Sequence, residues 1–137
     1  MLTQGFEVVE HTADWALHVA GRDWQQLLVY AAQGMNSLLV ADPAAVPLDE
    51  ERHLELEADD AESLLVDWLS ELAYWAETEQ LIFHQFDLAE VTPTTLKATV
   101  RGGRAAELQK HIKAVTYHNL EIVETTNGLE TTVVFDV

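Results

Sequence analysis

The sequence predicts an α+β fold in which two long amphipathic helices pack on a mainly antiparallel sheet of about seven strands. Apolar residues recur every three or four positions in two stretches of the chain, which is the period of a helix. Short segments that alternate apolar and polar residues surround these stretches, as expected of half-buried strands. Helices separated by runs of strands, with a hairpin near the end of the chain, are typical of antiparallel α+β proteins.

The first half of the chain is predicted to hold one helix and three strands. The strands cover residues 6–9, 14–19 and 53–58. Asp23 can cap the helix, because an aspartate side chain accepts backbone N–H groups at a helix start, and the helix ends before Pro43. Its buried stripe consists of Leu27, Leu28, Ala31, Ala32, Met35, Leu38 and Leu39.

The second half is predicted to hold the other helix and the remaining strands. Asp59 is the candidate cap of this helix. Gly102-Gly103 suggests a tight turn, and Asn127-Gly128 is typical of a type I′ hairpin turn. The helical stripe consists of Leu64, Leu65, Trp68, Leu69, Leu72, Ala73 and Ala76. The strands are expected at residues 81–88, 95–100, 112–118, 120–124 and 130–137.

Length and composition indicate one globular domain over residues 1–137. Hydrophobic residues make up 48% of the 137 residues, which is ordinary for a packed core and too high for a disordered chain. The absence of cysteine excludes disulfide frameworks, cysteine zinc sites and thiol nucleophiles. No export signal and no apolar run of membrane-spanning length is found, so we expect a cytoplasmic protein with no membrane partner.

The charge of the chain is strongly acidic and unevenly distributed. A formal net charge of −17 would repel nucleic acid over most of the surface, which favours metal ions or a basic protein as partners. Five of the seven basic residues nevertheless fall within residues 97–113. This stretch either contacts phosphates or an acidic site, or protects exposed strand edges from pairing. Lys113 is the best-defined candidate in this stretch, because a strand would direct its side chain to one defined face.

Asp14 and Asp136 are candidate metal ligands. Asp14 opens a strand, and Asp136 lies on the face opposite Phe135 and Val137 in the last one. If the first and last strands are neighbours, the two carboxylates approach each other, and Val137 adds main-chain or terminal oxygens. Ca²⁺, Mg²⁺ and Mn²⁺ prefer such oxygens and relieve the repulsion between carboxylates. The alternative is that both aspartates are solvated residues at strand ends.

The histidines and tryptophans give weaker signals. None of the six histidines has the spacing of a metal-binding helix. His11, near Asp14, and His118, at the end of an apolar run, are second-shell candidates for a metal, or they have structural roles. The four tryptophans mostly fall on predicted apolar faces, so we expect core packing rather than stacking on bases.

Three segments together resemble the archease family. They are HTAD at residues 11–14, LLVDWLSEL at 64–72, and IKAVTYH at 112–118 followed by the final FDV at 135–137. Their order and spacing run through nearly the whole chain. The chain departs from the family pattern after HTAD, where Trp15-Ala16 replaces an isoleucine-glycine pair.

The resemblance implies a protein cofactor rather than an enzyme. Archeases assist the GTP-dependent RNA ligase of the RtcB type in tRNA splicing and RNA repair, by promoting its guanylylation and multiple turnover. They are also described as chaperone-like modulators of tRNA-modifying proteins. Carried over to this sequence, the family's metal ligands are Asp14, Asp136 and main-chain Val137, and its functionally important lysine is Lys113.

Further expectations follow from the same resemblance. The cofactor is a divalent cation, Ca²⁺ in the first place and Mn²⁺ or Mg²⁺ as alternatives. RNA is reached only through the ligase. Self-association into a small homo-oligomer stays open, because the sequence does not determine the oligomeric state. Two other functions stay open: a free-standing metal-dependent phosphoesterase with a histidine base, and a chaperone that binds proteins without metal.

Overall fold

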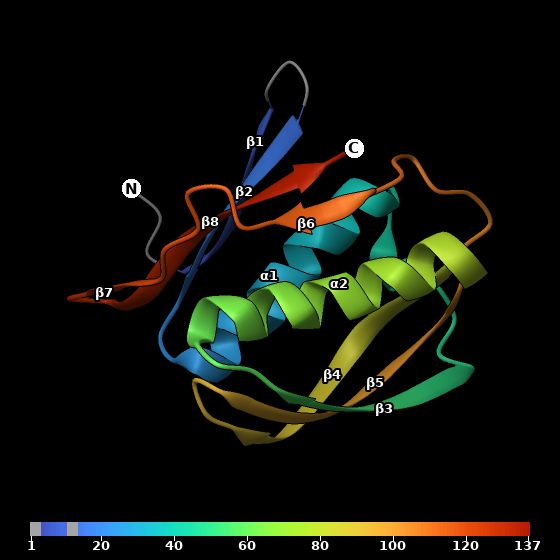
Figure 1. Ribbon diagram of the computed structural model, residues 1–137. Helices are drawn as coiled ribbons and strands as arrows, with labels where there is room; N and C mark the ends of the chain where they lie inside the picture. The colour runs from blue at the N-terminus through green and yellow to red at the C-terminus, as the bar shows by residue number, and fades with distance from the viewer. Residues whose placement is uncertain (1–3, 11–13) are drawn as a thin grey trace.

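In the described part of the chain, eight strands and two long helices form three layers. The computed structural model describes residues 4–10 and 14–137. Figure 1 shows the two helices between two antiparallel sheets, and both helices contact strands of each sheet. One sheet has the order β1-β2-β8-β6 with β7 also paired to β8, and the other has the order β3-β5-β4. The strands are β1 (Gly5–Glu10), β2 (Asp14–Gly21), β3 (Glu50–Glu57), β4 (Leu81–Val91), β5 (Thr95–Arg104), β6 (Ala114–Thr116), β7 (Val123–Thr125) and β8 (Gly128–Asp136).

The predicted α+β class is confirmed, and the strands divide between two sheets instead of forming one. β3, β4 and β5 pair only among themselves within the described chain. Each sheet buries one face against the helix layer, so the helices are covered on two sides. No helix in the described residues is long and apolar enough to cross a lipid bilayer.

Both helices begin at an aspartate cap. α1 (Trp24–Leu39) starts after Asp23, whose Oδ1 accepts the backbone N–H of Gln26 at 2.9 Å, as predicted. α2 (Ala61–Glu79) starts after Asp60, whose Oδ1 accepts the N–H of Ser63 at 2.7 Å. The prediction of Asp59 as the second cap was therefore wrong by one residue. The capping bond lowers the pKa of Asp60, since a backbone N–H stabilises the ionised carboxylate.

The predicted tight turn at Gly102-Gly103 is wrong, because both residues lie inside β5. β5 is the central strand of its sheet, and Gly102 pairs with Glu50 on one side and Phe83 on the other. A Cβ atom on Gly102 would lie against the carbonyl of Ile82 and 2.6 Å from the Cα of Phe83. The glycine therefore permits a close approach of two backbones beside the bulge in β4, and it does not serve a turn.

The end of the chain forms the predicted hairpin with different strand lengths. β7 and β8 meet at Gly128, which has a φ of 134° and pairs with Thr125. Backbone with a positive φ favours glycine. The hairpin itself is confirmed, but the predicted type I′ turn at Asn127-Gly128 is wrong. That turn needs a positive φ at both central residues, whereas Asn127 does not have one and the two loop residues are Thr126 and Asn127. β6 is shorter than the predicted strand at residues 112–118, because Ile112 and Lys113 belong to the irregular segment before it.

An ion pair joins the end of α2 to the edge strand β3. The Arg52 guanidinium donates to Glu79 through Nη1–Oε2 at 2.8 Å and Nη2–Oε1 at 3.0 Å, and it lies over the Trp75 ring at 5.2 Å. The hydrogen bonds from Arg52 hold the pKa of Glu79 below its ordinary value. A carboxylate of this kind stabilises the fold above its unfolded-state pKa, and the contribution is lost as the pH falls through its folded-state pKa.

Glu79→Gln is therefore expected to destabilise the protein more at pH 7 than in acid. Glutamine is uncharged at every pH, so it cannot form the ion pair with Arg52. Glu79 loses its charge in acid, so the difference in unfolding free energy between wild type and variant should shrink as the pH drops below about 4.3, the ordinary glutamate pKa. Urea unfolding of both chains between pH 7 and pH 3 measures this difference. A difference that stays constant, or grows in acid, would contradict the stabilising role of the pair.

Candidate metal and partner site

The ends of three strands meet at Asp136. In the five-stranded sheet Asp14 of β2 pairs directly with Asp136 of β8, and Ala114 of β6 pairs with Asp136 from the other side. The last strand, β8, pairs with the second strand, β2. The first strand, β1, lies on the other side of β2. Asp14 and Asp136 were predicted to lie side by side, and their backbones do so. The side chain of Asp14 lies outside the described part of the structure.

Asp136 belongs to the outer face of the sheet. Side chains alternate between the two faces of a strand. The neighbour of Asp136, Phe135, is fully buried against the helix layer, and Val115 opposite it is also buried. Asp136 itself is exposed, and Val137 after it is half-buried. An exposed carboxylate and the main-chain oxygens beside it are donors that hard divalent cations prefer.

Lys113 lies next to this junction. Its backbone N–H donates to the carbonyl oxygen of Asp136 at 2.7 Å, which fixes the start of β6 to the end of β8. The side chain of Lys113 is exposed. The structure therefore brings Lys113 and Asp136 together, although 23 positions separate them in the sequence.

Of the two histidine candidates, only His118 lies in the described part of the chain, and it is not brought to the junction. His118 is exposed, its N–H contacts Thr116 Oγ1 at 3.3 Å, and its ring lies 3.3 Å from the Asn119 amide. Thr116 pairs with Val134, two positions before Asp136, and His118 lies further along the chain in the same direction. His11 lies outside the described residues. Among the described side chains, which exclude those of His11 and Asp14, no three His, Asp or Glu groups gather as a metal site.

Comparison with known proteins finds related sequences over the full length of the chain. Residues 6–137 match the sequence model of the Archease protein family (MTH1598/TM1083). The chain belongs to the archease family. The archease of Methanosarcina mazei is 35% identical and that of Methanosarcina barkeri 32% identical, each over the whole of both chains.

Solved archease-family structures have the same fold. The solution structure of Methanobacterium thermoautotrophicum protein 1598 aligns with a TM-score of 0.78 and 31% identity, covering 97% of this chain and 99% of the other. The crystal structure of an archease from Thermotoga maritima, described as a possible chaperone, aligns with a TM-score of 0.65 and 25% identity over 96% of each chain. The fold predicted from the archease resemblance is therefore confirmed.

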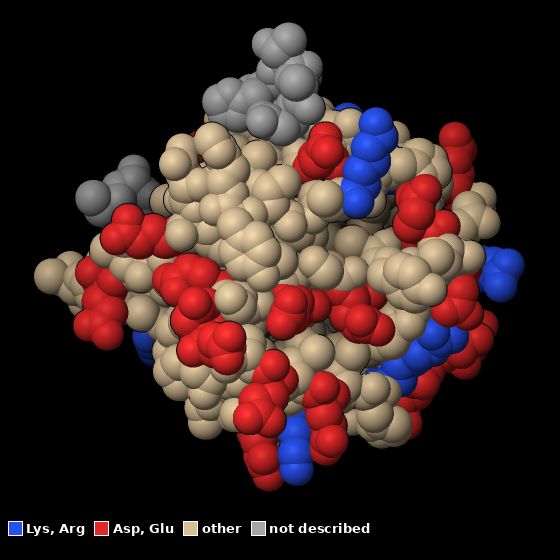
Figure 2. Space-filling model, in the orientation of Figure 1, with Lys and Arg blue, Asp and Glu red and all other residues tan. Residues whose placement is uncertain are grey.

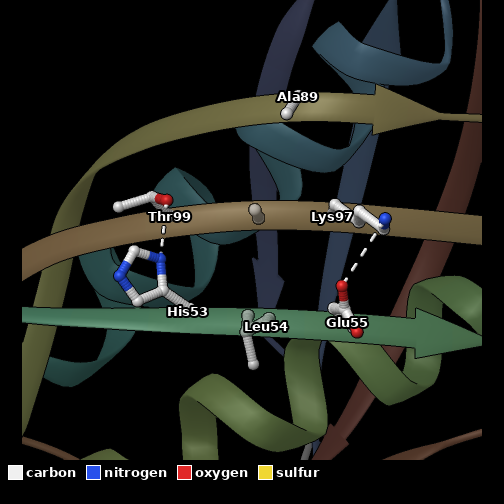
Figure 3. Close-up of a pocket in the computed structure, with 7 residues that line it drawn as sticks. His53, Leu54, Glu55, Ala89, Lys97 and Thr99 are labelled. Carbon is white, nitrogen blue, oxygen red and sulfur yellow. Dashed lines mark hydrogen bonds and ion pairs between the residues drawn. The ribbon is translucent and has the colours of Figure 1, made fainter.

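Two members of the basic stretch, Lys97 and Arg101, are paired with acidic side chains in this archease-family chain. Lys97 lies 3.6 Å from Glu55 and 3.7 Å from Glu90, and the Arg101 Nε donates to Glu51 at 2.7 Å. Figure 3 shows Lys97 directed toward Glu55 across the outer face of the three-stranded sheet. Because β5 is the central strand, these two residues do not protect a strand edge, and that alternative is wrong for them.

The contact of Lys110 with Trp15 was not predicted from the sequence. The Lys110 ammonium lies 4.0 Å from the centroid of the Trp15 ring, a cation–π distance. Trp15 follows Asp14 in β2, so this contact ties the segment before Lys113 to the strand that begins at Asp14. The clustering of basic residues in 97–113 was a signal in the sequence, but the aromatic partner Trp15 is distant in the chain.

The tryptophans pack in the core as predicted. Trp68 is fully buried and Trp75 nearly so, while Trp15 and Trp24 pack partly buried against the same cluster. Trp75 meets Phe83 edge to face at 5.3 Å. All four rings are therefore buried or half-buried in the core, as expected of packing residues.

Proposed function

We propose that this protein is a metal-binding activator of a GTP-dependent RNA ligase of the RtcB type. In this proposal it promotes guanylylation and multiple turnover of the ligase in tRNA splicing and RNA repair, and it is not itself an enzyme. The observation that supports it most is the register of β2 and β8, which pairs Asp14 with Asp136 beside Lys113. Membership of the archease family supports a role as a protein cofactor, and the ligase as partner is what the family resemblance implies.

Asp14, Asp136 and the main chain of Val137 would hold the cation. They supply carboxylate and carbonyl oxygens, which suit Ca²⁺, Mn²⁺ or Mg²⁺. These donors are fewer than the six to eight oxygens that Ca²⁺ takes, so water would complete the shell in the free protein. Lys113 would contact anionic groups of the ligase site or its nucleotide, and the net charge of −17 would favour encounter with a basic, RNA-binding partner.

The test is guanylylation of the ligase with and without this protein. Asp136→Asn and Lys113→Met are each expected to lower the stimulation at least about tenfold, comparable with losses seen when residues around metal sites are changed. Asp87→Asn is the matched control, because Asp87 is an exposed strand aspartate in β4 on the other sheet. Full stimulation by both site variants would contradict the activator mechanism.

Metal binding is measured on the same chains without the ligase. A cation that binds only the folded protein raises its stability by about 2.7 kcal/mol at a free concentration a hundred times its Kd. We expect Ca²⁺ or Mn²⁺ to raise the Tm of wild type and of Asp87→Asn, and to have little effect on Asp136→Asn. Removal of the ion with EDTA should reverse the rise.

A chaperone-like role toward tRNA-processing proteins is the second candidate. The description of the Thermotoga maritima archease as a possible chaperone favours it. This function requires no cation, so it predicts partner binding that Asp136→Asn leaves intact and a Tm that added cations do not change. A phosphoesterase, in contrast, would hydrolyse a phosphate ester in the absence of any partner.

A further inference from the structure

A surface groove runs between α2 and β6, next to the junction of Lys113 and Asp136. Its volume is about 350 Å³. Ser70, Tyr74 and Thr78 of α2 line one side, and Lys113, Ala114 and Val115 line the other. α2 faces the reader in Figures 1 and 2, which show this side of the molecule.

The floor of the groove is apolar and its rim carries an exposed aromatic ring. Ala73, Ile112 and Val115 are buried and line the groove. Tyr74 on the rim is 61% exposed, the largest exposed fraction among the large apolar side chains of the described chain. Tyrosines in such positions are enriched at protein interfaces, because the ring contributes contact area and the hydroxyl a hydrogen bond.

The α2 side of the groove is acidic. Glu77 lines it, and Asp67 and Glu71 lie on the same stripe of the helix in the turns before Tyr74. Glu77 is held in place by His111, whose Nδ1 lies 2.9 Å from the carboxylate. Figure 2 shows acidic side chains along the part of the surface where α2 faces the reader. The α2 wall of the groove therefore complements a partner segment that combines an apolar side chain with arginine or lysine, while Lys113 lies on the opposite wall.

The groove is also continuous with the candidate metal junction. Lys113 lines the groove, and its N–H donates to the carbonyl of Asp136. A partner segment in the groove would thus be held next to the proposed cation, which a ligase must approach.

We propose that the α2–β6 groove is the docking site for the ligase, and that it receives a basic segment with one apolar anchor residue. The proposal rests on the proposed function, since it places the partner of that function on a particular surface. It assigns a binding role to residues of α2 that do not belong to the metal site.

The test is the affinity for the ligase of Thr78→Arg, measured by titration calorimetry. An arginine at this position would obstruct the groove and repel a basic segment. The Thr78 hydroxyl donates to the Tyr74 carbonyl in its own helix and to no other group of the described residues. A cation in the last helical turn is favourable, so the fold should be retained. We expect Kd to rise at least about tenfold, as on loss of an interface hot spot. Tyr74→Ala should weaken binding in the same direction.

Thr126→Arg is the matched control, because it adds the same charge at an exposed threonine between β7 and β8. We expect its Kd to stay within about twofold of wild type. Mn²⁺ affinity should be unchanged in Thr78→Arg and Thr126→Arg, which separates docking from metal binding.

Three outcomes would overturn the inference. Wild-type affinity of Thr78→Arg for the ligase, alongside lost stimulation in Asp136→Asn, would remove the docking site and leave the proposed function standing. If Thr78→Arg instead abolished self-association of the protein in sedimentation, the groove would belong to a second copy. If it changed only the affinity for a single-stranded RNA, the occupant would be nucleic acid. No binding of the ligase by wild type would contradict the proposed function itself.

Discussion

Trp68→Ala is expected to lower the free energy of unfolding by roughly 3–5 kcal/mol, the usual loss for a fully buried tryptophan or phenylalanine. Trp68 is fully buried in α2, its indole Nε1–H donates to the Leu28 carbonyl of α1 at 2.9 Å, and its ring meets Phe86 of β4 edge to face. One side chain therefore joins both helices to the three-stranded sheet. Since small domains are stable by about 5–15 kcal/mol in total, much of the variant could be unfolded at 37 °C.

Urea unfolding followed by far-UV circular dichroism measures this loss. Trp68→Phe keeps an aromatic ring in the core and loses the indole donor, so it should cost less than the alanine variant. Tyr74→Ala is the matched control on the exposed side of the same helix, and a change within about 0.5 kcal/mol is expected. Equal losses for Trp68→Ala and Tyr74→Ala would show that Trp68 does not join the layers as described.

Gly102→Ala is expected to destabilise the protein by about 3 kcal/mol, at the upper end for added core volume. The new Cβ would lie against the Ile82 carbonyl and the Phe83 Cα, which are backbone atoms of the neighbouring strand β4. Because β5 is held by β3 on its other side, the strand cannot move away freely. A loss of this size corresponds to a fall in Tm of roughly 10 °C for a chain of this length.

Differential scanning calorimetry measures the Tm, and Gly34→Ala is the matched control. A Cβ on Gly34, within α1, would meet the Leu17 side chain at 2.7 Å instead of a backbone atom. A side chain can move, and alanine favours a helix over glycine by about 1 kcal/mol, so the control should lose less. A Tm for Gly102→Ala close to that of wild type would mean that β4 and β5 can separate at little cost.

Local patterns determined the elements of the fold. The stripes from Leu27 to Leu39 and from Leu64 to Ala76 have a period that only a helix places on one face, and both are buried in the structure. The terminal hairpin was predictable because its turn depends on the conformational freedom of Gly128, although the predicted turn type was wrong. Gly102 was misread for the same reason: a glycine at a turn and a glycine under a neighbouring strand look alike until the neighbour is known.

The candidate site was predictable only in its chemistry. Asp14, Asp136 and Lys113 were chosen from their residue types and from the family resemblance, while their meeting depends on β2, β8 and β6 being neighbours. The α2–β6 groove had no sequence signal, because its two walls are separated along the chain by β4 and β5. Tyr74 looked like any exposed residue of an amphipathic helix.

The sequence by itself determined the α+β class, both helices, the terminal hairpin, the acidic charge and the oxygen-donor character of the candidate ligands. These properties depend on residues close together in the chain, or on totals. Only the tertiary structure decided the division into two sheets, the register that sets Asp14 opposite Asp136, and the groove beside Lys113. Strand pairing joins residues far apart in sequence through backbone hydrogen bonds that are the same for nearly all side chains, so local patterns do not specify which strands pair.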